Sequence, residues 1–336
     1  YIPPTIAGIV LAYRGRLLAG GILTAFFIAL QIMSNHVQMS YYFLFVILFI
    51  AGAYFEDAWR NKTLPGFFKA SAVLLVAALI GVAANLSNLY HTYTYSKETM
   101  RGKSELVQTG NAAKQTSSGL DRDYITNWSY GIGETWTLLV PNFKGGSSAA
   151  PLSQSETAME KANPMYGSLY NSFPQYFGSQ PWTAGPVYVG AFVLFLFVLG
   201  CFIVKGPLKW ALLGATFFSI VLAWGKNFMP LTDFFIDYIP MYNKFRAVSS
   251  ILVIAEFTIP LLAIFALKRV LEEPGIWKTN KKAFGISLAL TAGVALLLVI
   301  APGSLGSGFV PAQEAQMLQN AVDQQMIPAN ELSGIL

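Results

Sequence analysis

Long apolar blocks separated by short polar stretches run along most of the chain. A helix needs about 20 mostly apolar residues to cross the ~30 Å hydrocarbon core of a bilayer. The pattern predicts an all-α integral membrane protein, a polytopic helical bundle, with seven full transmembrane helices at Leu17–Met33, Met39–Phe55, Ala70–Tyr90, Pro186–Val204, Trp210–Gly225, Val248–Leu267 and Ala283–Ala301. We interpret the shorter apolar run Ile6–Tyr13 as a partial helix, and we expect the chain to be an internal fragment that lacks an N-terminal part.

The polar stretches divide the chain into four regions. Residues 1–94 hold the partial helix and three spans, and residues 186–301 hold four spans. Between them, residues 95–185 are rich in Ser, Gly, Asn, Gln and aromatic residues, which predicts a large irregular loop with short helices. Residues 227–247 carry the aromatic side chains expected of an outer re-entrant or interfacial element. Residues 302–336 turn polar, and we expect them to start a further, truncated region on the outer side.

The positions of the basic residues orient these spans. Of the 22 Lys and Arg residues, twelve fall in four alternate short loops, around Arg14, Arg60, Lys205 and Lys268. The short loops on the other side hold three, and the remaining seven lie in residues 95–185. The positive-inside rule ignores that segment because long loops translocate regardless of charge. We therefore expect a multi-pass protein of the bacterial cytoplasmic (inner) membrane whose 95–185 loop is extracytoplasmic.

Composition removes several other classes of protein. Hydrophobic residues make up 54% of the chain and charged residues 12%, against roughly 25% charged in an average soluble domain. The net charge of +5 forms no basic stripe, so no nucleic-acid partner is expected. The one cysteine, Cys201, excludes a disulfide framework, and His36 and His91 cannot build a zinc site alone. We therefore predict no metal site from these residues.

A tight turn between two expected spans holds the first group of candidate residues. Five polar side chains lie between Ser34 and Ser40, including Asn35, His36 and Gln38. Polar groups so close to lipid must be satisfied by the protein, by water or by a ligand. We predict that Asn35, His36 and Gln38 bind substrate and that His36 is a candidate catalytic residue. The alternative is a well-bonded interfacial turn with no further role.

Glu256 is the second candidate, because it is a carboxylate well inside an expected span. Placing a charge there costs at least ~2.5 kcal/mol. We expect its side chain to face the protein interior near an outer-facing cavity, where it is a candidate catalytic residue. The alternative is a structural hydrogen bond between helices.

Lys244 and Arg246 stand just outside the Val248 span, where two cations could neutralise a phosphate. Arginine offers a planar fork that binds two phosphate oxygens, whereas the alternative is snorkelling to lipid headgroups. Asp233 and Asp237 could pair with these cations, or could hold a metal ion if a third ligand came from elsewhere. The cofactor is therefore unknown, and a divalent cation stays open.

Glu134 lies among aromatic residues, close to Trp128 and Tyr130. Aromatic faces suit sugar rings, and they also suit a membrane interface. We predict that Trp128, Tyr130 and Glu134 contact substrate, and Glu134 is a further candidate catalytic residue.

Four sequence stretches together resemble a known family. They are the turn His36-Val37-Gln38 with Tyr41-Tyr42, the run Trp128–Thr135 leading to Leu138–Phe143, the run Tyr176-Phe177-Gly178 to Gly185–Gly190, and Lys244–Ser249. In this order and topology they look like the YfhO family of bacterial polytopic membrane proteins, particularly its Bacteroides-type members. The resemblance covers essentially Tyr1 to Ala301.

The resemblance implies a function that composition and spacing do not show. The family is related to the GT-C glycosyltransferases, which transfer a sugar from a polyprenyl-phosphate carrier to a cell-envelope glycan or lipid acceptor on the extracytoplasmic face. Relatives carry the expected catalytic aspartate in an outer loop upstream of this chain. They also often have a second arginine where this chain reads Ser249-Ser250, which leaves Arg246 with Lys244 as the phosphate contact.

Two other classes of function stay open. A lipid-linked-sugar flippase or transporter would place Glu256 on a translocation path, and a non-catalytic envelope-assembly protein would use its outer loop to bind partners. The polar residues gather at one face rather than at the midplane, and the sequence has no evident inverted repeat. Both observations disfavour the transporter.

Overall fold

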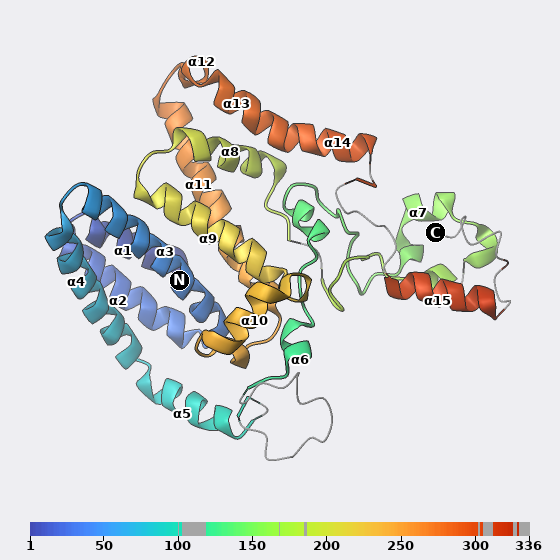
Figure 1. The fold of residues 1–336 in the computed structure, drawn as a ribbon, viewed down its shortest axis with the longest axis horizontal. Helices are drawn as coiled ribbons and strands as arrows, with labels where there is room; N and C mark the ends of the chain where they lie inside the picture. The colour runs from blue at the N-terminus through green and yellow to red at the C-terminus, as the bar shows by residue number, and fades with distance from the viewer. Residues whose placement is uncertain are drawn as a thin grey trace.

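A computed structural model describes residues 1–99, 101–102, 119–167, 169–184, 187–301, 303–304, 312–324 and 328. Within these ranges the regular elements are helices, and one isolated bridge joins Pro151 and Pro174. The α-helices, arranged as in Figure 1, are α1 (Ile2–Tyr13), α2 (Leu17–Met33), α3 (Val37–Arg60), α4 (Leu64–Ala83), α5 (Leu86–Lys97), α6 (Arg122–Thr126), α7 (Glu156–Lys161), α8 (Ala191–Ile203), α9 (Pro207–Ala223), α10 (Met229–Tyr238), α11 (Val253–Glu272), α12 (Ile276–Thr279), α13 (Lys281–Leu288), α14 (Val294–Ile300) and α15 (Ala312–Asp323).

Shorter helical turns connect several of these helices. The 3₁₀ turns are η2 (Gly133–Leu138), η3 (Leu152–Gln154), η4 (Pro164–Tyr166), η5 (Leu169–Asn171), η6 (Gly225–Phe228), η7 (Tyr242–Lys244) and η8 (Val248–Leu252). A π-helical turn, η9 (Ala289–Gly293), joins α13 to α14. Helix α15 lies within the polar region that follows Ala301. Pro186, and most of residues 302–336, lie outside the described residues.

Four helical segments are long and apolar enough to cross a membrane: Val37–Arg60, Leu64–Ala83, Val248–Glu272 and Lys281–Ile300. A fifth is present if Pro207–Ala223 and Gly225–Tyr238 count as one span, although a bend of 106° separates them. Helices α1, α2 and α8 are apolar but shorter. The all-α membrane fold is therefore confirmed, whereas the count of seven spans stays a prediction.

Two expected spans have different boundaries in the structure. Helix α4 begins at Leu64 and ends at Ala83 instead of running to Tyr90. The side chain of Asn85 donates to the carbonyl of Ala29 (2.9 Å) and marks the break before α5, because a bonded asparagine competes with the helix backbone. Helix α8 begins only at Ala191, since Gly190 has φ 101°.

Close approach of backbones holds α1 against α2. A Cβ at Gly20 would lie 2.6 Å from both the nitrogen of Ala12 and the oxygen of Gly8. Small residues at a helix interface allow such close packing within a membrane, where no hydrophobic force drives helices together. Helices α1 to α4 therefore form one compact group, on the left of Figure 1.

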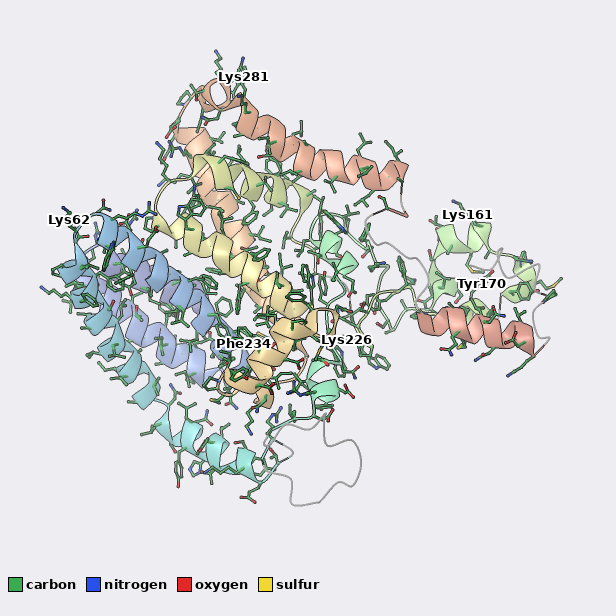
Figure 2. The ribbon with its side chains drawn as sticks, viewed as in Figure 1. Lys62, Lys161, Tyr170, Lys226, Phe234 and Lys281 are labelled. Atoms are coloured by element: carbon green, nitrogen blue, oxygen red, sulfur yellow. The ribbon has the colours of Figure 1, made fainter. Side chains whose placement is uncertain are left out.

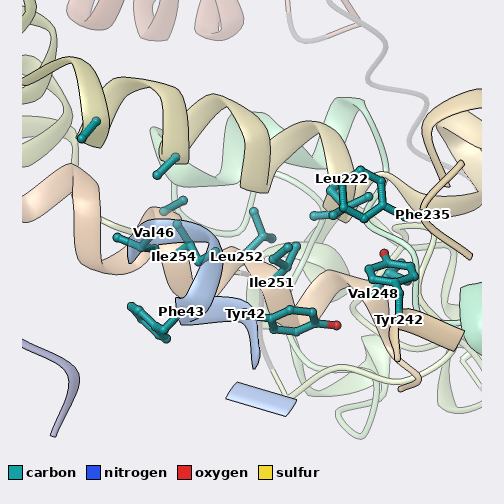
Figure 3. Packing of buried hydrophobic residues seen from close by; sticks show 14 of the residues in the cluster. Tyr42, Phe43, Val46, Leu222, Phe235, Tyr242, Val248, Ile251, Leu252 and Ile254 are labelled. Carbon is teal, nitrogen blue, oxygen red and sulfur yellow. The ribbon is translucent and has the colours of Figure 1, made fainter. Parts of the chain in front are cut away.

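The main apolar core lies where α3, α9 and α11 meet. Tyr42 of α3, Ile251 of η8 and Ile254 of α11 are fully buried there, and Figure 3 shows Tyr42 beside Ile251. The hydroxyls of Thr216 in α9 and Thr258 in α11 lie 2.6 Å apart and form a hydrogen bond between these helices. This core holds the C-terminal end of α9 in place, and η6 and α10 follow that end.

A sharp bend follows α9 and turns the chain into α10. Gly225 adopts φ 47°, and a Cβ there would lie 2.1 Å from Oγ of Ser129. The hydroxyl of Ser129 accepts from the backbone N–H of Lys226 (2.9 Å), so a residue of the 119–184 segment stabilises the bend. The sequence predicts an interfacial or re-entrant element at 227–247, and in the structure α10 and η7 occupy this region.

The described part of the 95–185 segment contains the end of α5, the helices α6 and α7, and four 3₁₀ turns. Its later part packs against α15, with Phe173 and Leu318 buried together, as the lobe at the right of Figure 1 shows. In Figure 2, Lys62 and Lys281 lie at one end of the helices, whereas Lys226 and Phe234 lie toward the other. The side of the membrane on which each end lies stays a prediction.

Candidate functional site

Arg246 lies in an exposed position between η7 and η8, against two aromatic rings of the 119–184 segment. Its guanidinium carbon lies 5.5 Å from the ring centroids of both Tyr124 and Trp128. Its Nη1 donates to the hydroxyl of Tyr124 at 2.7 Å. The structure thus brings together two separate candidates of the sequence analysis, Arg246 and Trp128, and adds Tyr124. We call these three residues the Arg246 cage.

Two bonds hold the backbone around the cage. The side chain of Gln38 donates to the carbonyl oxygen of Arg246 (2.7 Å) and to the hydroxyl of Tyr42 (2.9 Å). The backbone N–H of Ser249 donates to the carbonyl of Trp128 (3.0 Å). The amide nitrogen of Gln38 positions the residue that carries the guanidinium, and the expected contact of Gln38 with substrate stays a prediction.

The turn before α3 presents His36 and Asn35 at the surface near this backbone contact. His36 is the N-cap of α3, and its Nδ1 accepts from the backbone N–H of Met39 (3.4 Å). Asn35 adopts φ 58°, and its Oδ1 accepts from Asn88 (3.4 Å). The turn is therefore partly bonded internally, whereas the exposed imidazole keeps Nε2 for a ligand. The N-terminal end of α3 also adds a partial positive charge.

Lys244 bonds elsewhere. Its Nζ donates to the carbonyl of Arg101 (2.6 Å), and its own carbonyl accepts from Nε of Arg101 (2.9 Å). Burial lowers the pKa of Lys244 below its ordinary value. Through these two bonds Lys244 connects η7 to Arg101, which follows α5.

Asp233 and Asp237 of α10 both bind Arg122 of α6. Asp233 pairs with Nη1 of the guanidinium and Asp237 with Nη2. The expectation that they pair with Lys244 or Arg246 is therefore wrong, because Lys244 bonds the carbonyl of Arg101 and Arg246 bonds the hydroxyl of Tyr124 instead. The hydrogen bond to Asp237 is the largest of the causes that raise the pKa of Arg122. Among the described residues no group of three or more His, Cys, Asp or Glu side chains gathers that could hold a metal ion.

Sequence reasoning missed Arg122, although a signal for it exists. Two carboxylates four residues apart on one helix face require a nearby cation, and Arg122 begins the first short helix of the outer segment. Neither observation alone indicates which of the 22 basic residues supplies the partner.

Glu134 is buried, with 1% of its surface exposed. One carboxylate oxygen accepts from the hydroxyl of Tyr176 and the other from the backbone N–H of Gly131. Burial and the charge of Glu134 raise the pKa of Tyr176, and burial lowers the pKa of Lys144 while Glu134 opposes that shift. Glu134 therefore organises the interior of the loop, and in this conformation it does not face an exposed site.

The Glu134 cluster is connected to the segment that carries Arg246. The hydroxyl of Tyr176 accepts from the backbone N–H of Gln180 (2.9 Å), whose side-chain oxygen accepts from the hydroxyl of Ser249 (3.0 Å). Ser249 thus bonds through both its hydroxyl and its N–H. Ser249 is therefore a structural residue that joins this segment to the loop.

Tyr130 was expected to contact substrate and is instead fully buried. Its backbone N–H donates to the carbonyl of Ala223 (2.8 Å), and its carbonyl accepts from Asn227 (2.9 Å). Burial is the largest cause of the raised pKa of its phenol. Tyr130 therefore joins the loop to the end of α9.

Glu256 is exposed, so the expectation that it faces the protein interior is wrong. The helical repeat explains this position, because the buried residues of α11 lie on the opposite face: Ile254, Ala255, Thr258, Ile259 and Leu262. Glu256 lines a shallow cavity of about 350 Å³ together with Tyr1, Pro3 and Phe43.

An apolar cavity of about 450 Å³ lies between α1, α2, α3 and α4. Its polar lining at the α3 end includes Gln31, Ser40 and Tyr41. The ring of Tyr41 packs on Phe245, with centroids 5.1 Å apart, and its hydroxyl donates to the carbonyl of Pro240 (2.9 Å). The cavity therefore approaches the residue that precedes Arg246.

The described residues define a helical membrane protein with an exposed cationic and aromatic site beside an apolar cavity. Comparison of the chain with protein-family models, with curated proteins and with solved structures found no match.

Proposed function

We propose that the protein is an integral-membrane glycosyltransferase of the GT-C kind, which transfers a sugar from a polyprenyl-phosphate carrier to a cell-envelope acceptor. The observation that carries this proposal is the position of the Arg246 cage beside the apolar cavity. A lipid carrier presents a phosphate at headgroup level and a hydrocarbon tail below it. Arg246 fits the phosphate, the cavity fits part of the tail, and the face of Trp128 suits the sugar ring.

In this proposal seven helices cross the inner membrane and the 95–185 segment lies on the extracytoplasmic side. An acceptor hydroxyl attacks the anomeric carbon, and the bond from that carbon to the phosphate oxygen breaks with its electron pair passing to the phosphate. Arg246 stabilises the phosphate that leaves. The hydroxyl proton passes to a base, for which His36 and Glu256 are exposed candidates whereas Glu134 is buried.

Arginine substitutions test the proposal in a sugar-transfer assay with a polyprenyl-phosphate donor. A charge-assisted hydrogen bond contributes ~1.5–3 kcal/mol, so Arg246→Ala should reduce donor use by roughly 10- to 150-fold. Arg246→Lys keeps the charge without the fork and should fall between wild type and Arg246→Ala.

Lys226→Ala is the matched control, because Lys226 is an exposed cation that follows α9 and lies outside the cage. It should leave transfer unchanged. Equal activity of wild type, Arg246→Ala and Arg246→Lys would instead identify Arg246 as a headgroup anchor and contradict the proposed donor site.

A further inference from the structure

A second cavity, of about 800 Å³, lies at the C-terminal end of α11, far along that helix from the Arg246 cage. It forms where the α1–α2, α3–α4 and α8–α9 connections meet this helix end. Six basic and three acidic side chains line it: Arg14, Lys69, Lys205, Lys209, Lys268 and Arg269, with Asp57, Glu272 and Glu273. Basic side chains therefore exceed acidic ones by three.

Most of this positive charge is not neutralised within the protein. Glu272 and Glu273 are paired with Lys268 at 3.7 Å and Arg269 at 2.9 Å. The other basic side chains of the lining form no ion pair with a described residue: Arg14, Lys69, Lys205 and Lys209. Of these, Nζ of Lys209 donates to the carbonyl of Cys201 (3.2 Å) and lies 4.4 Å from the ring centroid of Trp210. In addition, Nε of Arg269 is buried without a hydrogen-bond partner. An anion is the ligand that would satisfy these groups.

The remainder of the lining is apolar and aromatic. Tyr13 stacks between Tyr54 and Phe67, with ring centroids 5.0 and 5.2 Å apart. Aliphatic and aromatic side chains from five helices or their ends complete this surface: Val10, Leu17, Val204, Leu208 and Phe265. The cavity thus combines cations with hydrocarbon surface, whereas a site for a soluble anion needs no apolar wall.

We propose that this cavity binds the phosphate headgroup of an anionic phospholipid. Basic pockets between transmembrane helices bind such headgroups, and the volume lies within the ~300–1,000 Å³ range of small-molecule sites. Arg14 lies in the α1–α2 connection, Lys69 near the start of α4 and Lys205 in the α8–α9 connection, so the bound headgroup joins the α1–α4 group to α8, α9 and α11. The proposal does not depend on the glycosyltransferase function.

Lipid retention by the full chain tests this site. The protein would be purified in detergent, equilibrated with phosphatidylglycerol or phosphatidylcholine, and analysed by native mass spectrometry. Wild type should retain phosphatidylglycerol preferentially. The triple variant Arg14→Gln, Lys69→Gln, Lys205→Gln should bind it more than ~10-fold less tightly, since each basic group near a lipid surface contributes about a factor of five.

The control triple variant is Lys62→Gln, Lys281→Gln, Lys282→Gln, which removes exposed cations from the same end of the bundle but none that lines the cavity. It should retain phosphatidylglycerol as wild type does. Equal loss in both triple variants would show general attraction to anionic lipid and overturn the proposal.

Competition with inorganic pyrophosphate distinguishes a site for a lipid headgroup from a site for a soluble phosphate anion. Pyrophosphate should displace little phosphatidylglycerol, because it cannot use the apolar wall. Complete displacement by millimolar pyrophosphate would show a site for soluble anions and overturn the lipid assignment. Helicity and elution volume verify the fold of each variant. If the triple variant misfolds, the single variant Lys205→Gln, which lies in an exposed connection, should still retain less phosphatidylglycerol than wild type.

Discussion

Gln38 and Arg246 are 208 positions apart in sequence, and a hydrogen bond of 2.7 Å joins the side chain of the first to the backbone carbonyl of the second. This bond connects the N-terminal turn of α3 to the segment that carries the guanidinium. The placement of Arg246 therefore depends on a residue that need not touch any ligand.

Gln38→Leu should test this dependence. The substitution removes the donor to Arg246 and to Tyr42, so we expect a loss of about 1–2 kcal/mol in the free energy of unfolding. If Arg246 binds the donor phosphate, KM for the donor should rise several-fold while protein yield stays close to wild type. Ser34→Ala is the control, because its hydroxyl bonds only the carbonyl of Gln31 in the same turn. An unchanged KM in Gln38→Leu would mean that the cage holds its position without this bond.

Glu134→Gln should change the titration of Tyr176. Burial and the charge of Glu134 hold the pKa of this phenol above its ordinary value of 10. Its contribution to stability is therefore fully present below pH 10 and is lost as pH rises through the raised folded-state pKa. Removing the charge should bring phenolate formation by Tyr176 closer to pH 10. Ultraviolet absorbance titration measures this: the curve of the double variant Glu134→Gln, Tyr176→Phe is subtracted from the curve of Glu134→Gln, which leaves the signal of Tyr176. A tyrosine signal that does not move would contradict the assigned contact.

Glu134→Ala should destabilise the protein more than Glu134→Gln does. Alanine leaves the hydroxyl of Tyr176 and the N–H of Gly131 without their buried acceptor, and each buried donor left unsatisfied costs about 1–3 kcal/mol. Chemical unfolding followed by tryptophan fluorescence measures the difference, and Glu156→Ala on the exposed helix α7 is the control. A loss below 1 kcal/mol would show that water satisfies the cluster.

Arg122 should hold the outer segment on α10. Its side chain is 21% exposed and those of Asp233 and Asp237 are 42% and 43% exposed, so we expect Arg122→Ala to cost only about 1 kcal/mol. The double variant Asp233→Asn, Asp237→Asn should cost a similar amount, and combining all three changes should add little because they remove one interaction. Limited proteolysis of residues 119–128 gives a second readout. Additive losses would show that Arg122 stabilises the segment through other contacts.

Gly20→Val should separate α1 from α2. A Cβ at Gly20 meets backbone atoms of α1 at 2.6 Å, and overpacking of this kind costs about 1–3 kcal/mol. Gly52→Ala is the matched control, because no atom lies within 4 Å of a Cβ placed there and glycine costs roughly 0.5–1 kcal/mol in a helix interior. Thermal unfolding in detergent should therefore show a lower midpoint for Gly20→Val and an equal or higher one for Gly52→Ala. Equal midpoints would contradict the close packing.

The apolar pattern predicts where most helices lie, because the length and composition of a span are local properties of the sequence. It does not predict their ends equally well. Helix α8 is shortened by the backbone angle at Gly190, and α4 is separated from α5 at Asn85, whose side chain reaches α2. Such ends depend on single torsion angles and on contacts with other helices.

In the candidate site, too, local features could be predicted from the sequence, whereas features that depend on long-range packing could not. The position of Arg246 before a long apolar helix predicts a cation at the end of a span, whereas its contact with Trp128 was not predicted from the sequence. Burial of Glu134 and exposure of Glu256 reverse what residue type and hydropathy suggest. Those two outcomes depend on how the 119–184 segment folds and on which face α11 turns inward, and both are set by long-range packing.

The contact between Ser129 and Gly225 has a consequence for how this protein can change during evolution. A side chain at position 225 would occupy the space of the Ser129 hydroxyl, and loss of that hydroxyl would leave the N–H of Lys226 without its acceptor. Drift at either position is therefore constrained by the other, and a lineage that replaces the glycine must acquire a compensating change at 129. We therefore expect positions 129 and 225 to covary in an alignment of related chains.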